Sequence, residues 1–189
     1  MADESGDLEG QPAWQPVMTR AQAVRWAAES AFPSPVYHVT TVEAAAAIRV
    51  HGFDLGRRAG GRAWGDGVYA AVDEATRDAY LRQLGSHGVA LELRVAVNRV
   101  LRIRIPFAGG RQPFEYVLAA IPDGLGRLVM ARLMTPDPAA ALTQVIVQAG
   151  YDALEVLEDR FSWAIGGRQL VIFDPKRIVV IDDEDADAR

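Results

Sequence analysis

Tyr69 and Tyr80 are the residues of this chain whose type and spacing most directly suggest chemistry. They lie in the stretch 65–80, Gly-Asp-Gly-Val-Tyr-Ala-Ala-Val-Asp-Glu-Ala-Thr-Arg-Asp-Ala-Tyr, where a short apolar run leads into a polar segment. A strand end and the helix after it can present both rings to one cavity, where two aromatic faces could hold a flat heteroaromatic ring. The alternative is that both tyrosines are partly buried packing residues, the commoner role of aromatic side chains.

The residues around Tyr80 predict the helix that would carry it. Asp73 is a good N-cap because its carboxylate can accept backbone N–H bonds from the next turn. Glu74 adds negative charge at the positive end of the helix dipole. The helix should run to about Leu84 and stop at Gly85, since glycine suits the left-handed position after a helix.

Length and composition indicate one globular domain that is not embedded in a membrane. The chain has 189 residues, half of them hydrophobic, which suffices for one sizeable core. It contains no run of eighteen apolar residues, and its acidic start is not a Sec signal peptide, so we expect a cytoplasmic protein. There are no cysteines, and His38, His51 and His87 show no metal-ligand spacing, so we expect no metal.

Charge separates the chain into a body and two tails. The formal net charge of the chain is −5. Residues 1–18 contain acidic side chains and no lysine or arginine, and residues 182–189 contain five acidic side chains. Residues 19–181 hold 16 acids and 19 bases, and all but one of those bases are arginine. We therefore predict a disordered acidic tail at 1–18, a mildly basic domain at 19–181 that suits an anionic ligand, and an acidic tail at 182–189.

Periodicity and turn residues predict an α+β fold with a largely antiparallel sheet. Thr19 and Thr40 are the expected N-caps of the first two helices, which should end near Ala31 and His51. The other expected helices cover 73–84, 114–121, 125–134 and a segment that starts at Thr135 or Asp137 and ends at Gln148. The expected strands cover 36–39, 89–97, 101–105, 152–157, 169–173 and 178–181.

Three separated pieces of the chain resemble the ADP-ribosyltransferase superfamily, on its diphtheria-toxin and poly(ADP-ribose)-polymerase side. The segment Tyr37-His38-Val39-Thr40 is similar to the first-strand motif, and Gly65–Tyr80 is similar to the Gly-x-Gly-x-Tyr-x-Ala segment with its second tyrosine. The segment Gln169–Pro175 is similar to the late strand that begins with the catalytic glutamate. The resemblance implies split antiparallel β-sheets with flanking helices and a His-Tyr-Glu triad with glutamine in the third position.

The resemblance also implies a substrate and a site. NAD would bind between the sheets without a metal, with the strand Tyr37-His38-Val39-Thr40 along it. His38 would form a hydrogen bond with the adenosine ribose. Tyr69 and Tyr80 would stack on the nicotinamide, and Gln169 would face the nicotinamide ribose. Val39 occupies the position where the family often has a glycine, whose backbone forms hydrogen bonds with the nicotinamide amide. The arginines of the 57–62 segment could meet the pyrophosphate.

Glutamine at position 169 limits the chemistry, because it is neutral and cannot act as a general base. This argues against chain elongation, and we expect a mono-ADP-ribosyltransferase or an NAD hydrolase, with Glu155, Glu158 or Asp159 as a possible source of a carboxylate. The alternatives are a catalytically weak or inactive NAD-binding module, or an enzyme similar to RNA 2′-phosphotransferases. The sequence does not identify the acceptor, which could be protein or nucleic acid. The alanine- and arginine-rich composition suggests a bacterial source, where a toxin with an antitoxin or immunity partner is one possibility.

Overall fold

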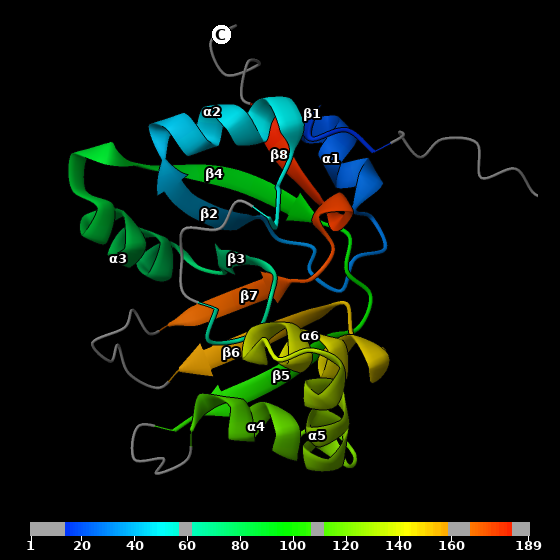
Figure 1. Cartoon of the computed structure of the whole chain (residues 1–189). Helices are drawn as coiled ribbons and strands as arrows, with labels where there is room; N and C mark the ends of the chain where they lie inside the picture. Colours follow the sequence, from blue (N-terminus) through cyan, green and yellow to red (C-terminus); the bar gives the residue numbers. More distant parts are fainter. Residues whose placement is uncertain (1–13, 57–61, 107–111, 159–166, 183–189) are drawn as a thin grey trace, which may run out of the picture.

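The computed structural model describes residues 14–56, 62–106, 112–158 and 167–182 (Figure 1). These residues form a mixed α+β fold, as the sequence predicts. In chain order the elements are β1 (Val17–Thr19), α1 (Arg20–Trp26), β2 (Val36–Thr41), α2 (Val42–His51), β3 (Val68–Ala71), α3 (Glu74–Leu84), β4 (Gly88–Val95), β5 (Val100–Ile105), α4 (Pro113–Ala119), α5 (Gly124–Met134), α6 (Pro138–Gln148), β6 (Ala153–Glu158), β7 (Arg168–Ile172) and β8 (Ile178–Asp182).

The strands form one eight-stranded sheet in the order β1-β8-β4-β2-β3-β7-β6-β5. The neighbouring pairs are antiparallel except β1 with β8 and β5 with β6, which run parallel. The prediction of a largely antiparallel sheet therefore holds for the described strands, although the sheet is mixed. Hydrogen bonding joins all its strands into one sheet, whereas the family resemblance implied split sheets.

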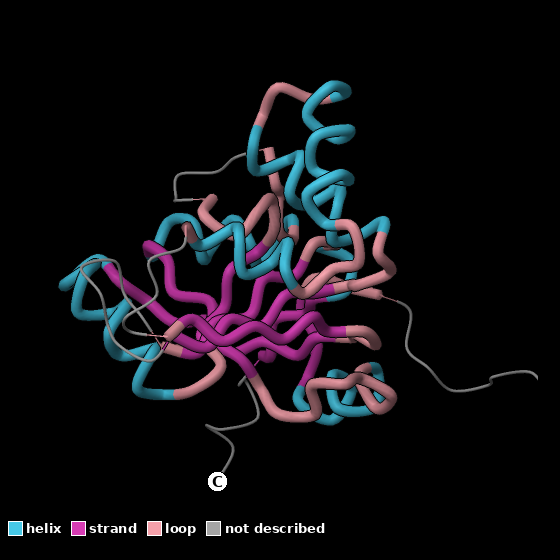
Figure 2. The backbone as a smooth tube through the Cα atoms, turned by 90° about the horizontal axis from the view of Figure 1, so that it is seen from below, coloured by secondary structure: helices cyan, strands magenta, loops and turns pink. Residues whose placement is uncertain are grey.

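A narrow junction divides this sheet into two halves. Strands β2 and β3 share one register pair, Tyr37 with Ala71, whereas β2 and β4 are paired from Val36 to Thr41. One half is therefore β1-β8-β4-β2 and the other is β3-β7-β6-β5. Helices lie on both sides of the strands when the molecule is seen from below (Figure 2).

Two large core clusters hold the halves in place. The first packs α4, α5 and α6 onto β5, β6 and β7, with Val145, Ile146 and Val171 fully buried in it. The second draws residues from both halves, including Leu91 and Leu93 of β4 and Leu170 of β7. Burial of alternate residues in β4 confirms the predicted alternation from Leu91 to Val97.

Local capping signals place most helix ends correctly. Asp73 accepts a hydrogen bond from the Thr76 N–H (2.7 Å), and Gly85 follows α3 with a φ of 59°. Helix α2 is capped by Thr41, which accepts from the Ala44 N–H, so the prediction of Thr40 was wrong by one residue. Thr19 caps α1 as predicted, but α1 ends at Trp26 and not near Ala31.

The predicted boundary of the N-terminal tail was wrong. Val17–Thr19 pairs in parallel with Val180–Asp182, and the Trp14 indole donates to the Ile178 carbonyl (3.1 Å). These long-range contacts bring residues from Trp14 onward into the fold, and Asp182 belongs to β8. Residues 1–13 and 183–189 of the predicted tails lie outside the described residues. Within the described ranges, no helix combines the length and apolarity needed to cross a membrane.

Candidate functional site

The three sequence motifs lie on three adjacent strands, β2, β3 and β7. Tyr37 pairs with Ala71, and Ala71 pairs with Gln169, so these residues form one line across the sheet. Tyr69 precedes Ala71 by two residues and therefore faces the same side. The described structure thus groups Tyr37, Tyr69 and Gln169 on one face, with the small Ala71 side chain between Tyr37 and Gln169. Gln169 is buried, with 5% of its surface exposed.

His38 belongs to the opposite face of its strand, where it is paired with Leu91 of the second core cluster. Its Nδ1 lies 2.8 Å from the Tyr69 carbonyl oxygen, and its ring meets Phe53 edge-on at 5.0 Å. A carbonyl oxygen only accepts, so Nδ1 carries the proton in this bond. Burial lowers the pKa of His38, which favours a neutral ring whose Nε2 is an acceptor.

The His38 bond also has a structural role. It crosses from β2 to β3 at the junction, where those strands share a single register pair. The imidazole thus supplies a cross-strand hydrogen bond next to the single register pair, Tyr37 with Ala71, that joins β2 and β3 in the described part of the chain. The other residues of the predicted β2 motif, Val39 and Thr40, are paired with Ala90 and Val89 of β4.

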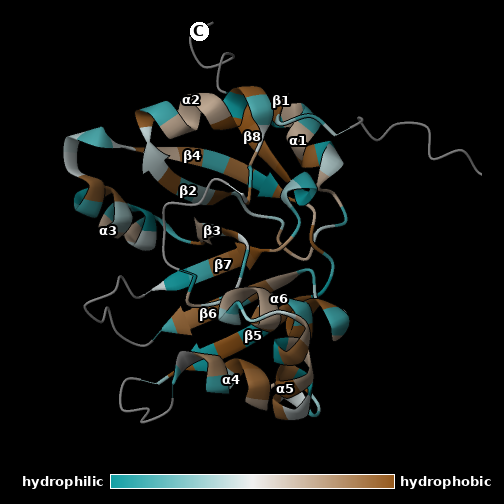
Figure 3. Cartoon of the chain, in the orientation of Figure 1, coloured by the Kyte–Doolittle hydropathy of each residue, from teal (hydrophilic) through white to brown (hydrophobic). Residues whose placement is uncertain are grey.

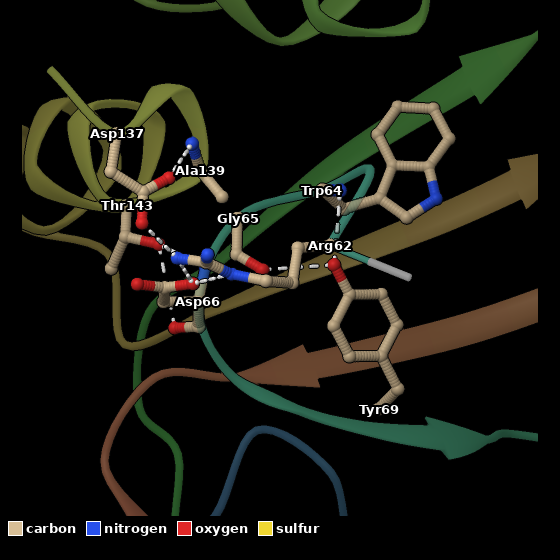
Figure 4. A network of polar contacts seen from close by, with 8 residues as sticks. All are labelled: Arg62, Trp64, Gly65, Asp66, Tyr69, Asp137, Ala139 and Thr143. Carbon is tan, nitrogen blue, oxygen red and sulfur yellow. Dashed lines mark hydrogen bonds and ion pairs between the residues drawn. The ribbon is translucent and has the colours of Figure 1, made fainter. Parts of the chain in front are cut away.

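The hydroxyl of Tyr69 is engaged by the loop before β3 (Figure 4). It accepts a hydrogen bond from the Trp64 N–H (3.0 Å) and donates to the Gly65 carbonyl (2.9 Å). Burial is the main cause that raises the pKa of Tyr69 to about 12, and the nearby Asp66 adds to it. The hydroxyl is therefore protonated and positions the loop, while the ring is partly exposed.

A polar network fixes the same loop to the start of α6 (Figure 4). Arg62 donates to the carboxylates of Asp66 and Asp137, and Asp137 is also the N-cap of α6. The Asp66 N–H donates to the Thr143 hydroxyl at 2.6 Å. Arg62 therefore ties the loop to the start of α6, and its suggested contact with the pyrophosphate stays a prediction. Arg57 and Arg58 lie outside the described residues.

Tyr80 lies near Tyr69 on the helix that follows β3. The two tyrosines are close enough for the Tyr80 charge to contribute to the raised pKa of Tyr69. Burial, followed by the nearby Glu158, raises the pKa of Tyr80 to about 12. One turn earlier, the buried Thr76 accepts a hydrogen bond from the Arg168 N–H (3.1 Å), which ties α3 to the start of β7. Tyr69, Tyr80 and Glu158 therefore share one region, and Glu158 follows Val156, the strand partner of Gln169, by two residues.

The carboxylates considered from the sequence have different environments. Glu155 is buried and accepts hydrogen bonds from Arg102 Nε (2.8 Å) and from Arg168 Nε, so both of its oxygens are occupied. Glu158 is half-buried, and burial raises its pKa. Asp159 lies outside the described residues. Of these three carboxyl groups, Glu158 is therefore the one that the structure places near Tyr80.

A separate open hollow of about 340 Å³ lies where α3 meets β2 and β4. Tyr37 and Arg77 line it with Glu92, and the Arg77 guanidinium lies 4.9 Å from the centre of the Tyr37 ring. The hollow does not include Tyr69, Tyr80 or Gln169. It therefore extends the candidate site only through Tyr37.

Sequence reasoning missed two parts of this region. The clamp of Arg102 and Arg168 on Glu155 depends on the β5–β6 register, in which Arg102 is directly paired with Glu155. The Arg62–Asp137 bond joins residues far apart in the chain. Opposite charges on two predicted strands, 101–105 and 152–157, were a usable signal for the first, whereas the second has no local signal.

Comparisons with known proteins give no assignment: neither a scan against family models nor a search of curated proteins finds a match for this chain. Among the residues that the structure describes, no group of three histidines or acids could hold a metal ion.

Proposed function

We propose that the chain is an NAD-dependent mono-ADP-ribosyltransferase with an ADP-ribosyltransferase-like fold. The observation that carries the proposal is the line Tyr37–Ala71–Gln169 across β2, β3 and β7. The motifs on which the resemblance rests are more than a hundred residues apart at the extremes, yet they occupy neighbouring strands. The single-pair junction between two half-sheets further supports a fold of this kind.

In this proposal the nicotinamide lies against the partly exposed rings of Tyr69 and Tyr80. Gln169 faces the same side as Tyr69 and would hydrogen-bond a hydroxyl of the nicotinamide ribose. His38 would accept a hydrogen bond at Nε2 from a hydroxyl of the adenosine ribose, with Thr40 on the same face of β2. Because His38 and Tyr69 face opposite sides of their strands, NAD would have to cross the β2–β3 junction to meet both.

The chemistry is a substitution at the nicotinamide ribose. The bond between the sugar carbon and the nicotinamide nitrogen breaks, and the pair of electrons leaves with the ring. Positive charge then develops on the sugar, as in glycoside hydrolysis. An acceptor hydroxyl or amine, or water, attacks that carbon and loses its proton. Gln169 can orient the ribose but cannot take the proton, so we expect slow turnover and no chain elongation.

Glu158 is the candidate for the missing base. It lies close enough to Tyr80 to raise the pKa of that tyrosine, and its own pKa is raised by burial. A carboxylate with a raised pKa is a better proton acceptor near neutral pH than an exposed one. We further propose that the acceptor is a protein or a nucleic acid. If the protein is a toxin, it would have an antitoxin or immunity partner.

The alternatives make different predictions. A catalytically inactive module would bind NAD without releasing nicotinamide. An RNA 2′-phosphotransferase-like enzyme needs arginines that reach phosphates, but Arg62, Arg102 and Arg168 are each bound to carboxylates. No observation favours that second activity.

Calorimetry at millimolar NAD tests the proposal. We expect saturable binding that nicotinamide competes away. Tyr80→Ala should weaken nicotinamide binding by roughly 1–3 kcal/mol if the ring stacks as nucleobases do on aromatic side chains. Tyr116→Ala is the matched control, because Tyr116 is a partly buried tyrosine on α4 and no residue of α4 is assigned to NAD. If folded Tyr80→Ala protein binds nicotinamide normally, the ring clamp is wrong.

A further inference from the structure

Helix α5 exposes an unusually apolar outer face. Its large exposed side chains are Leu125 (67%), Val129 (56%), Met130 (64%), Leu133 (74%) and Met134 (81%). Soluble proteins seldom expose so many large apolar side chains together unless something binds there. The hydropathy colouring shows the helix as largely apolar (Figure 3).

The positions of these residues make a continuous stripe. At about 100° per residue, Leu125, Val129 and Leu133 follow one another along the helix, with Met130 and Met134 beside them. The inner face carries Gly124 and Ala131, which are buried. The stripe runs for about three turns, which is enough to contact another helix along its length.

Two arginines border the stripe. Arg127 and Arg132 are exposed and fall at the two opposite edges of the apolar face, between it and the buried face. The helix Gly124–Met134 contains no acidic residue. Its outer surface is therefore apolar in the middle and cationic along both edges, which complements an apolar stripe bordered by carboxylates.

Other occupants fit this surface less well. The acidic chain ends could pair with the arginines, but residues 1–13 contain only Met1 and Leu8 as large aliphatic side chains, and 183–189 contain none. A second copy that packed α5 against α5 would bring arginine-bordered edges together.

We propose that α5 is a docking site for an amphipathic helix of a partner protein, with acidic residues along both borders of that helix's apolar face. The apolar stripe supplies the buried contact, and Arg127 and Arg132 select the sign of the partner's charge. This surface lies on α5 and does not include any residue assigned to NAD, so the inference is independent of the proposed activity.

The test uses the full chain and two helix-forming peptides of about 18 residues, long enough to hold a helix in water. Both carry leucines along one face, bordered on both sides by glutamate in one peptide and by lysine in the other. Fluorescence anisotropy should show the glutamate-bordered peptide binding about tenfold more tightly, with a preference that weakens in high salt. The double variant Arg127→Glu, Arg132→Glu should reverse the preference.

Further variants separate the stripe from its borders. Met130→Ser with Leu133→Ser should remove binding of both peptides without lowering stability, since both side chains are exposed. Val50→Ser, on the exposed face of α2, is the matched control and should leave binding unchanged. The proposal is overturned if neither peptide binds, or if the preference for the glutamate-bordered peptide is unchanged in the double arginine variant. It is also overturned if the stripe variants abolish self-association or vesicle binding and leave peptide binding unchanged.

Discussion

The substitution Tyr69→Phe separates the two roles of that tyrosine. It keeps the ring but removes the hydroxyl that accepts from Trp64 N–H and donates to the Gly65 carbonyl. Both of those residues are buried, so the loop would lose two hydrogen bonds with little access to water. At about 1 kcal/mol for each bond, the free energy of unfolding should fall by about 2 kcal/mol.

For a protein of this length, that loss corresponds to a decrease in Tm of about 4–8 °C. Scanning calorimetry measures it, and Tyr116→Phe is the control, because no hydrogen bond joins the Tyr116 hydroxyl to the described residues. In Tyr116→Phe the free energy of unfolding should change by no more than about 0.5 kcal/mol. Tyr69→Phe should still bind nicotinamide, whereas Tyr69→Ala should lose both stability and binding. A wild-type Tm in Tyr69→Phe would refute the anchoring role of the hydroxyl.

Three further changes test the frame around the site. Glu155→Gln should destabilise the fold by about 1–3 kcal/mol in urea unfolding, because it removes the buried charge that Arg102 and Arg168 share. Gly67→Ala should cost about 1–3 kcal/mol in the same assay, because a Cβ there would lie 2.7 Å from Val171 Cγ1 and 2.8 Å from the Ile172 carbonyl oxygen. Because burial lowers the pKa of His38, the unfolded chain takes up the proton first as the pH falls through about 6.5, so stability should decrease below that pH. The decrease in stability on acidification should be smaller in His38→Gln.

The sequence predicted the local features of this fold well. The cap at Asp73 and the stops at Gly52 and Gly85 depend on the conformational preferences of single residues, and each is present. The alternating pattern of Leu91–Val97 likewise follows from burial of one strand face. Strand β1 was missed because its three residues carry no periodic pattern and are held by pairing with β8, at the other end of the chain.

The site was predicted only in part for the same reason. The sequence grouped the segments containing Tyr37, Tyr69 and Gln169 only through the family resemblance, and these segments lie on adjacent strands. The face on which His38 lies and the partners of the Tyr69 hydroxyl depend on register and on the loop conformation, which no local pattern specifies. The Arg62 network joins two segments separated in sequence, so the same arginine could be assigned to a ligand or to the fold until the contacts were seen.

The most direct test of the account is release of labelled nicotinamide from NAD by the wild-type protein and by Gln169→Glu, in the absence of any acceptor. We predict slow release by the wild type and an increase on the order of 10²–10³-fold in Gln169→Glu, because a carboxylate would stabilise positive charge on the ribose. Assays from about pH 6 to about pH 9 allow for a buried glutamate that stays protonated at low pH. If neither protein binds NAD or releases nicotinamide at any pH in that range, the proposed function is wrong.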